Sequence, residues 1–366
     1  LWRHVGDAYV HVAAPARTSG AWLRDVAATF DAGNVGVVVF FLVSGYVIPF
    51  SFKSGRDGAV GSFLIKRFWR IFPAYWLSVP LGALTGFWIW GLPFTLADVA
   101  INFTLLETVF RTRSAEGLYW TLLAEWTFYA LCVVLFLTHS LANTRRLLGL
   151  AVLLLCAYLA TVGTWNLGLH ALDPVFGVAC FYLSIMLSGT LYRTCIAEPG
   201  ADRRLKAGVI ALLAVYTFAL PIVGLVRVGL GTSPWVPCAI GFWLFVIGTR
   251  WVRVSTRLTD WLGRISYSIY LLHPIVFMAL LWWLSRPSTN AWWRQQHLAV
   301  YLLVNACITI ALAALAFRFV EKPGIRLGHR WARRWEEREA QSVSGTSGDV
   351  AERRLREPDH RNHREE

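Results

Sequence analysis

Nine long apolar runs dominate the sequence and limit the folds that are open to it. They are residues 35–52, 71–91, 118–138, 147–165, 175–192, 207–226, 235–249, 265–284 and 299–317. A bilayer core ~30 Å thick is crossed by a helix of about 20 apolar residues. Backbone polar groups must be satisfied inside the lipid, and a helix does this within one segment. The sequence therefore predicts an all-α, polytopic transmembrane helix bundle of about nine helices.

The composition agrees with a membrane protein. The 366 residues are 56% hydrophobic and only 16% charged, with a mean hydropathy of +0.49, whereas soluble domains carry about 25% charged residues. The six cysteines lie within or at the edge of the apolar runs, and no two of them have CxxC spacing. They are interpreted as apolar packing residues. We expect neither a disulfide framework nor a metal site, and any chemistry must lie in the membrane part.

The loops between the runs differ in charge, which predicts the orientation. The loops 53–70, 139–146, 193–206 and 250–264 hold 15 Lys and Arg residues, the alternate set of loops holds 8, and the segment after residue 317 holds 12. Cytoplasmic loops of membrane proteins carry the excess of Lys and Arg. We therefore expect the richer loops and the C-terminus in the cytoplasm of a multi-pass inner or plasma membrane protein. The net charge of +13 follows from this topology and does not indicate nucleic-acid binding.

The chain divides at about residue 327 by composition. Residues 1–327 form the predicted membrane domain. Residues 328–366 are rich in Arg, Glu, Ser and Gly, a composition that buries too little apolar surface to fold alone. We expect a charged surface helix over 328–341 and a disordered cytoplasmic tail beyond it. The charge count places the first loop outside, so a helix ending near His4 is expected to precede it.

Two polar residues within the runs are candidates for function, because polar groups are costly in a membrane. Glu125 needs a cation, a histidine or a proton when buried; an ion pair that fixes helix packing is the alternative. His273 directly precedes Pro274, whose missing amide leaves a backbone carbonyl one turn earlier without its donor. A structural histidine is therefore as good an interpretation as a catalytic one.

Two short segments have both a structural and a functional interpretation. Ser44 and Gly45 are small enough to let two helices approach closely. Lys66, Arg67 and Arg70 stand directly before an apolar run. These cations either mark the cytoplasmic edge of the membrane or hold a phosphorylated ligand, and helical spacing of the arginines favours the ligand.

Five segments in order resemble the signatures of one family. They are "FFLVSGYVIPFS" (40–51), "FLIKRFWRIFPAYW" (63–76), "LYWTLLAEWTFYAL" (118–131), "LGRISYSIYLLHPIVF" (262–277) and "VEKP" (320–323). The chain resembles the membrane-bound acyltransferase-3 family, whose members O-acylate sugars, surface polysaccharides, macrolides and similar acceptors. The resemblance implies an integral membrane O-acyltransferase that moves an acyl group, here expected to be acetyl, from acyl-CoA to a hydroxyl of a carbohydrate or other small molecule.

The resemblance also implies roles for individual residues. His4 matches the essential histidine of the family, and Glu125 matches its acid. Arg67 and Arg70 match the R-x-x-R element, and His273 matches a late histidine. An arginine of the family's first helix would lie upstream of Leu1, so the sequence departs from the family pattern there.

The implied mechanism uses acyl-CoA as a substrate and no permanently bound cofactor. Arg67 and Arg70, with Lys66 beside them, hold its phosphates. His4 deprotonates the acceptor hydroxyl, and Glu125 orients the imidazole or stabilises its cation.

The oxyanion donor and the class of protein have alternatives. Ser44, Tyr267 or Tyr270 could donate to the thioester oxygen, and the sequence does not choose among them. The other class considered is a transporter of a small solute, which would bind its substrate at the bilayer midplane between internal repeats. The sequence has no obvious paired halves. The expected partners are acyl-CoA, a hydroxylated acceptor and the lipid bilayer.

Overall fold

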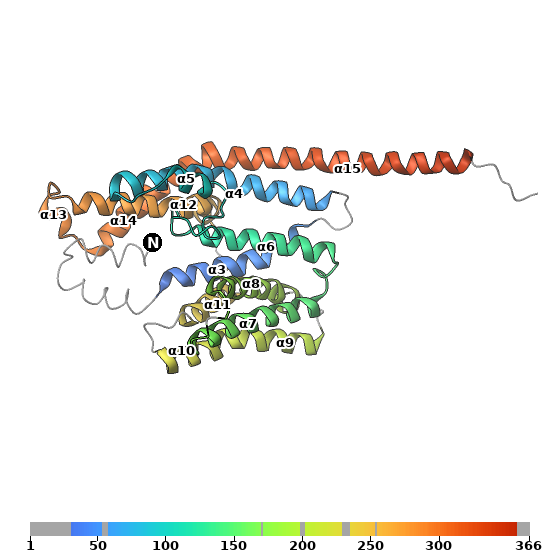
Figure 1. Cartoon of the computed structure of the whole chain (residues 1–366), viewed down its shortest axis with the longest axis horizontal. Coiled ribbons are helices and arrows are strands. Elements are labelled where there is room, and N and C mark those ends of the chain that lie inside the picture. The colour runs from blue at the N-terminus through green and yellow to red at the C-terminus, as the bar shows by residue number, and fades with distance from the viewer. Residues whose placement is uncertain are drawn as a thin grey trace, which may run out of the picture.

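A computed structural model describes residues 31–52, 58–169, 171–197, 202–228, 235–252 and 255–356. These residues form helices and connecting turns, with no strand among them (Figure 1). The all-helical bundle expected from the sequence is confirmed. His4, the predicted general base, lies outside the described residues.

Among the described residues, the first helix begins at Ala32. The helices of the first half are α3 (Ala32–Val47), η1 (Ile48–Ser51), α4 (Ala59–Leu84), η2 (Thr85–Ile89), α5 (Leu96–Asn102), α6 (Tyr119–Leu137), α7 (Thr144–Asn166) and α8 (Pro174–Tyr192). Polar side chains begin several of them: Asp31 accepts a hydrogen bond from the amide of Asn34, and Asn143 accepts one from the amide of Arg146. Such caps satisfy amides that have no partner within the helix.

The second half begins with a short π-helical turn after α8. Its helices are η3 (Arg193–Ala197), α9 (Arg203–Ala214), η4 (Val215–Ala219), α10 (Leu220–Val228), α11 (Trp235–Arg250), α12 (Arg257–Ser285), α13 (Ala291–Arg294), α14 (Leu298–Ala316), η5 (Phe317–Glu321) and α15 (Lys322–Arg356). Thr256 and Thr259 form a capping box at the start of α12, which fixes where this long helix begins.

A helix overlaps each of the nine predicted spans. Among the described residues, seven helices are long and apolar enough to cross a membrane. α11 has 16 residues and is apolar but shorter. α4 is not among the seven: its first half carries three cations and its second half contains Pro73 and Pro80. The helix α4 begins at Ala59, twelve residues before the predicted span, so Lys66, Arg67 and Arg70 lie within a helix and not in a loop.

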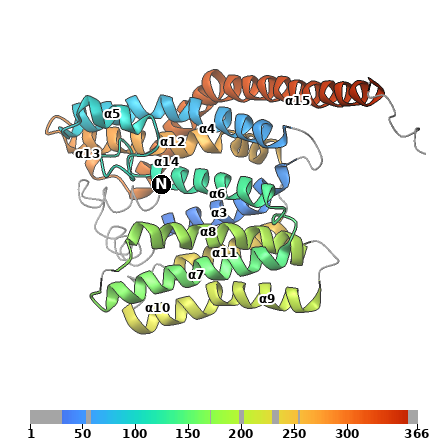
Figure 2. The same cartoon turned by 45° about the vertical axis from the view of Figure 1, so that its right-hand side comes forward.

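The helices form two groups with α6 between them. In one group α3 packs against α8 and α11, and α7 packs against α8; in the other, α4 packs along α15 and against α12, and α12 packs against α14 (Figure 2). One continuous apolar core joins α6 to both groups. The bundle has two distinct ends: α15 projects from one, which we call the α15 end, and α5 and α13 lie at the other, the α5 end (Figures 1 and 2).

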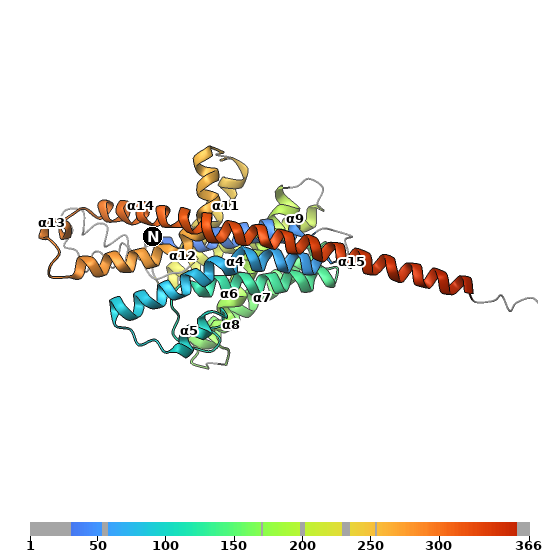
Figure 3. The ribbon, with the colours of Figure 1, turned by 90° about the horizontal axis from the view of Figure 1, so that it is seen from above.

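The C-terminal segment differs from the expectation. α15 includes 328–341, where a helix was expected, and continues to Arg356 through a stretch that was expected to be disordered. That stretch includes Ala, Glu and Arg, which are strong helix formers and extend a helix that has already begun. Seen from above, the first part of α15 runs alongside α4 before it leaves the bundle (Figure 3). The division at residue 327 remains a prediction.

Candidate active site

A cavity of ≈ 250 Å³ lies between α4 and α15, beside η1. We call it the basic pocket; its lining residues are Ser51, Ala59, Ser62, Phe63, Lys66, Arg67, Arg70, Ile325, His329 and Glu336. All three predicted cofactor-binding cations thus line one space. They share it because α4 is helical there, so that residues three and four apart fall on one face.

Lys66 is held at the pocket by two oxygen partners. Its Nζ lies 3.2 Å from Oε1 of Glu336 and 2.7 Å from Oγ of Ser62. Ser62 in turn donates to the same Oε1 at 2.5 Å. Neither Ser62 nor Glu336 was predicted from the sequence, because 274 residues separate them and no local pattern connects them.

Arg67 is held by aromatic rings and one hydroxyl. Its guanidinium carbon lies 5.4 Å from the ring centroid of Phe63 and 5.5 Å from that of Tyr129, within the range of cation–π attraction. Its Nη2 donates to Oγ of Ser51 at 2.9 Å. No carboxylate neutralises Arg67 among the salt bridges of the described residues, so its charge remains available to an anionic ligand.

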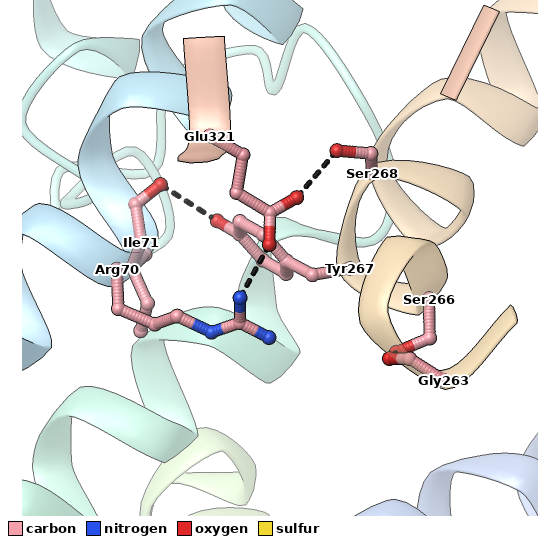
Figure 4. Close-up of polar contacts among 7 residues, drawn as sticks. All are labelled: Arg70, Ile71, Gly263, Ser266, Tyr267, Ser268 and Glu321. Carbon is pink, nitrogen blue, oxygen red and sulfur yellow. Dashed lines mark hydrogen bonds and ion pairs between the residues drawn. The ribbon is translucent and has the colours of Figure 1, made fainter. Parts of the chain in front are cut away.

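Arg70 is paired with a buried carboxylate (Figure 4). Its Nη1 lies 2.5 Å from Oε1 of Glu321, and Ser268 donates to Oε2 of Glu321 at 2.5 Å. The Glu321 side chain is 0% exposed. A buried charge is costly unless it is paired and hydrogen-bonded, and both conditions are met here. The pair fixes the position of Arg70 in the lining of the pocket.

Glu321 is a residue that sequence reasoning quoted only as part of "VEKP". It ends η5, a single π-helical turn between α14 and α15. Such turns are rare in helices and often occur at functional sites. A signal was present in the sequence, since a carboxylate follows the last apolar run by four residues. Its cation is 251 residues away in the chain, and only the fold could identify it.

Glu125 is buried on α6 and lies close to the basic pocket. It is 8% exposed, and Tyr129 donates its hydroxyl to Oε1 of Glu125 at 2.5 Å. The ring of Tyr129 is one of the two rings that the Arg67 guanidinium covers. Glu125, Tyr129 and Arg67 therefore form a continuous path from the pocket into the bundle.

The two tyrosines considered as oxyanion donors are already hydrogen-bonded to the backbone. Tyr267 donates to the carbonyl of Ile71 at 2.9 Å (Figure 4), and Tyr270 donates to the carbonyl of Leu118 at 2.9 Å. The hydroxyl of Tyr270 also contacts that of Thr121. A phenol has one proton to donate, so neither proton is directed to a ligand in this arrangement.

His273 is buried on α12 and completes the backbone around Pro274. Its Nδ1 lies 2.8 Å from the carbonyl oxygen of Tyr270, the carbonyl whose helical donor Pro274 lacks. Because a carbonyl only accepts, Nδ1 carries the proton in this contact. The structural interpretation of His273 has a geometric basis, and its catalytic role remains a prediction.

Ser44 and Gly45 lie where α3 crosses α8. A Cβ at Gly45 would be 1.7 Å from the main-chain oxygen of Met186, and Thr190 donates to the carbonyl of Gly45 at 2.9 Å. Only glycine permits this approach. Ser44 is buried beside it, 7% exposed.

A bundle of apolar helices with a cavity lined by cations at one end is typical of a multi-pass membrane protein that binds an anionic ligand. The acyltransferase-3 family model, described as an acyltransferase domain, matches residues 8–318. The chain belongs to this family and is a membrane acyltransferase that transfers groups other than aminoacyl groups. The resemblance seen in the sequence is confirmed.

The chain is also similar to three relatives, two of which are named as a transacylase or an acetyltransferase. Nodulation protein 10 of Rhizobium leguminosarum bv. viciae is 24% identical over 89% of this chain and 88% of its own length. The membrane-bound transacylase BcsY of Komagataeibacter xylinus is 26% identical over 66% of this chain and 65% of its own. The acetyltransferase ORF330 of Acidianus two-tailed virus is 22% identical over 67% of this chain and 73% of its own. No solved structure matches the chain.

Proposed function

We propose that this enzyme transfers an acyl group, acetyl in the simplest case, from acyl-CoA to a hydroxyl of a carbohydrate or other small-molecule acceptor. The convergence of Lys66, Arg67 and Arg70 on one cavity is the observation that carries the proposal. Acyl-CoA is an anionic donor, and arginine binds phosphate through two parallel hydrogen bonds. The family membership and the transacylase and acetyltransferase names of two relatives support the reaction class.

The donor enters from the α15 end, with its phosphates in the basic pocket and its acyl arm inside the bundle. Arg67 contacts phosphate directly, because its guanidinium has no carboxylate partner among the described salt bridges. Arg70, which is held by Glu321, presents a fixed cation. The arm then follows Tyr129 toward Glu125, which places the thioester near the predicted acid.

The transfer step needs one base, which takes a proton from the acceptor and returns it to the leaving group. His4 takes the proton of the acceptor hydroxyl, and the hydroxyl oxygen attacks the thioester carbonyl carbon. The carbon–sulfur bond then breaks, and the proton passes from His4 to the leaving CoA sulfur. Glu125 orients His4 or stabilises its imidazolium during this exchange. Of the three proposed oxyanion donors, Tyr267 and Tyr270 already donate to carbonyls, which favours Ser44.

Labelled acetyl-CoA tests the proposal directly. Membranes containing the full-length enzyme are incubated with the label and a panel of hydroxylated acceptors, and covalent transfer is measured. Transfer supports the enzyme; counterflow of a solute without transfer supports a transporter instead. His4→Ala should reduce the rate about 10²–10⁴-fold, as loss of a general base does, while acyl-CoA binding survives. Near-normal transfer by this variant contradicts the mechanism.

We also propose that the α15 end faces the cytoplasm of the cell membrane, where acyl-CoA is made. The 15 to 8 division of loop cations supports this orientation. Single cysteines placed in 55–60 and in 288–292 test it with an impermeant thiol reagent. Labelling of 55–60 from outside the cell reverses the orientation.

A further inference from the structure

The first part of α15 is packed as tightly as a core helix. A Cβ at Gly324 would lie 2.7 Å from Pro73, and one at Gly328 would lie 2.6 Å from Trp69. Neither glycine has room for a larger side chain, so α15 approaches α4 closely through this stretch. The segment from Gly324 to Glu336 is therefore a wall of the basic pocket, although its composition is that of a solvated tail.

This wall contributes one carboxylate to a pocket whose other charged lining residues are cations. Glu336 enters from α15, and its Oε1 accepts from both Ser62 and Lys66. The hydroxyl of Ser62 and the ammonium of Lys66 thus already donate to a carboxylate oxygen. Glu336 retains 17% side-chain exposure and Lys66 retains 29%, so the contact lies at the mouth of the pocket, where an incoming ligand can replace it.

His329 faces the same space. It lines the pocket together with Ile325 and Glu336, and residues at i, i+4 and i+11 share one face of a helix. Lys66 lines the same cavity from α4, so the two basic groups border one space. His329 is a fourth basic residue of the pocket, and it comes from the segment predicted as tail.

We propose that Ser62, Lys66 and His329 form a phosphomonoester subsite at the mouth of the basic pocket, which takes the 3′-phosphate of CoA in place of the Glu336 carboxylate. The inference rests on the proposed use of acyl-CoA. In CoA the thioester, the pantetheine arm, the pyrophosphate and the ribose 3′-phosphate follow in that order. Arg67 and Arg70 come five and eight residues after Ser62 along α4, and they take the pyrophosphate.

The charges favour the exchange. A phosphomonoester carries about −1.5 to −2 charges at pH 7 and three acceptor oxygens, whereas Glu336 carries one charge and two oxygens. Lys66 and Ser62 keep their hydrogen bonds after the exchange, and His329 gains one. The cavity of ≈ 250 Å³ is below the about 300–1,000 Å³ of pockets that enclose a whole ligand, so it suits the phosphorylated end of the donor and not all of it.

Binding of CoA and dephospho-CoA to the purified full chain, measured by titration calorimetry, tests the subsite. Dephospho-CoA lacks only the 3′-phosphate. We expect the wild type to bind CoA about tenfold more tightly than dephospho-CoA, from one or two charge-assisted hydrogen bonds. His329→Gln and Ser62→Ala should each reduce this preference severalfold and leave dephospho-CoA binding within about twofold. Arg330→Gln removes a neighbouring exposed charge and is the control for general electrostatic attraction.

Glu336→Gln should change CoA affinity in the opposite direction. Loss of the internal anion should tighten CoA binding severalfold and leave dephospho-CoA binding unchanged, while Glu337→Gln on the exposed side should change neither. Thermal unfolding of each variant without ligand shows whether the variant folds. If Ser62→Ala misfolds, the preference of His329→Gln for CoA over dephospho-CoA still tests the subsite, because His329 is exposed.

Four outcomes overturn the subsite. If the wild type binds CoA and dephospho-CoA equally, a 3′-phosphate contact is excluded. If His329→Gln weakens the binding of both ligands equally, His329 does not contact the 3′-phosphate specifically. If the wild type transfers acetyl groups without a phosphate preference, the subsite fails and the proposed function stands. If it neither binds CoA nor transfers, both fail.

Discussion

The α3–α8 contact and the α4–α15 contact both rely on glycines for close packing, but they differ in charge. In each, glycines let two helices approach until backbone and side chain touch: Gly45 and Gly189 in the first, Gly324 and Gly328 in the second. The first contact contains no ion pair among the described residues. The second contains the Lys66–Glu336 pair, and directly before α15 the last residue of η5, Glu321, pairs with Arg70 of α4.

The difference shows what close packing alone requires. The α3–α8 contact is stable with small residues and apolar neighbours, so helix association here needs no charge. Charges in the α4–α15 contact are an added cost, because ions must be desolvated to lie there. They lie together beside the basic pocket, which supports the proposal that this contact is the ligand site and the other is framework.

The largest expected effect is at the framework contact. Gly45→Ala places a methyl group 1.7 Å from the main-chain oxygen of Met186, and backbone cannot yield as a side chain does. We expect a loss above the ~1–3 kcal/mol of ordinary overpacking, and with it most of the folded protein. Gly36→Ala, on the same helix with nothing within 4 Å, is the matched control. Yield and thermal stability in detergent measure both, and equal values for the two variants would remove the distinction.

The next effect is at the buried pair of the ligand site. Arg70→Ala leaves Glu321 buried without its cation, which costs about 3 kcal/mol, the lower end of the range for broken buried pairs, since the Arg70 side chain is 37% exposed. Glu321→Gln in the same chain should recover part of that loss, because the uncompensated charge is gone. Thermal unfolding of the two single variants and the double variant measures the coupling. Additive losses would show that the two side chains act independently.

Arg67 should separate binding from stability. Arg67→Ala removes a cation that has no carboxylate partner in the described part of the chain, so the unfolding temperature should change little. Acyl-CoA use should weaken about tenfold or more, because a charge-assisted phosphate bond is worth ~1.5–3 kcal/mol. Lysine should restore only part of this, since it lacks the planar fork. Arg264→Ala, an exposed cation on α12 outside the pocket, serves as the control, and an equal change in KM for both variants would argue against phosphate contact.

The smallest effect, counted for each pH unit, concerns the α5 end of α4, where Glu116 has no salt-bridge partner among the described residues. Glu116 packs against Gly82, and burial raises the pKa of its carboxyl to about 8. Because the folded pKa is above the unfolded value, the stabilisation is complete below about pH 4.5 and is lost as the pH rises toward 8. The slope is at most about 1.4 kcal/mol for each pH unit. Glu116→Gln should flatten the dependence of the melting temperature on pH between 5 and 8.

Local patterns predicted the spans because run length and hydropathy are properties of neighbouring residues. The helix over 118–138 appears as α6 (Tyr119–Leu137), and the run 175–192 appears as α8 (Pro174–Tyr192). The start of α4 was misplaced because the cations in its first half conceal an otherwise continuous helix. The end of α15 was misplaced because a composition too polar to fold alone can still extend a packed helix.

By itself the sequence determined the helical membrane class and the family, and it singled out the cations and the acid, Glu125, as candidates, since these depend on residue type and short spacing. Only the tertiary structure decided which charges meet: Arg70 with Glu321 across 251 residues, and Lys66 with Glu336 across 270. It also brought His329 from the predicted tail to the pocket. The reason is physical, because burial and pairing of a charge depend on the elements that surround it, and here the glycine contacts of α15 with α4 bring those elements together.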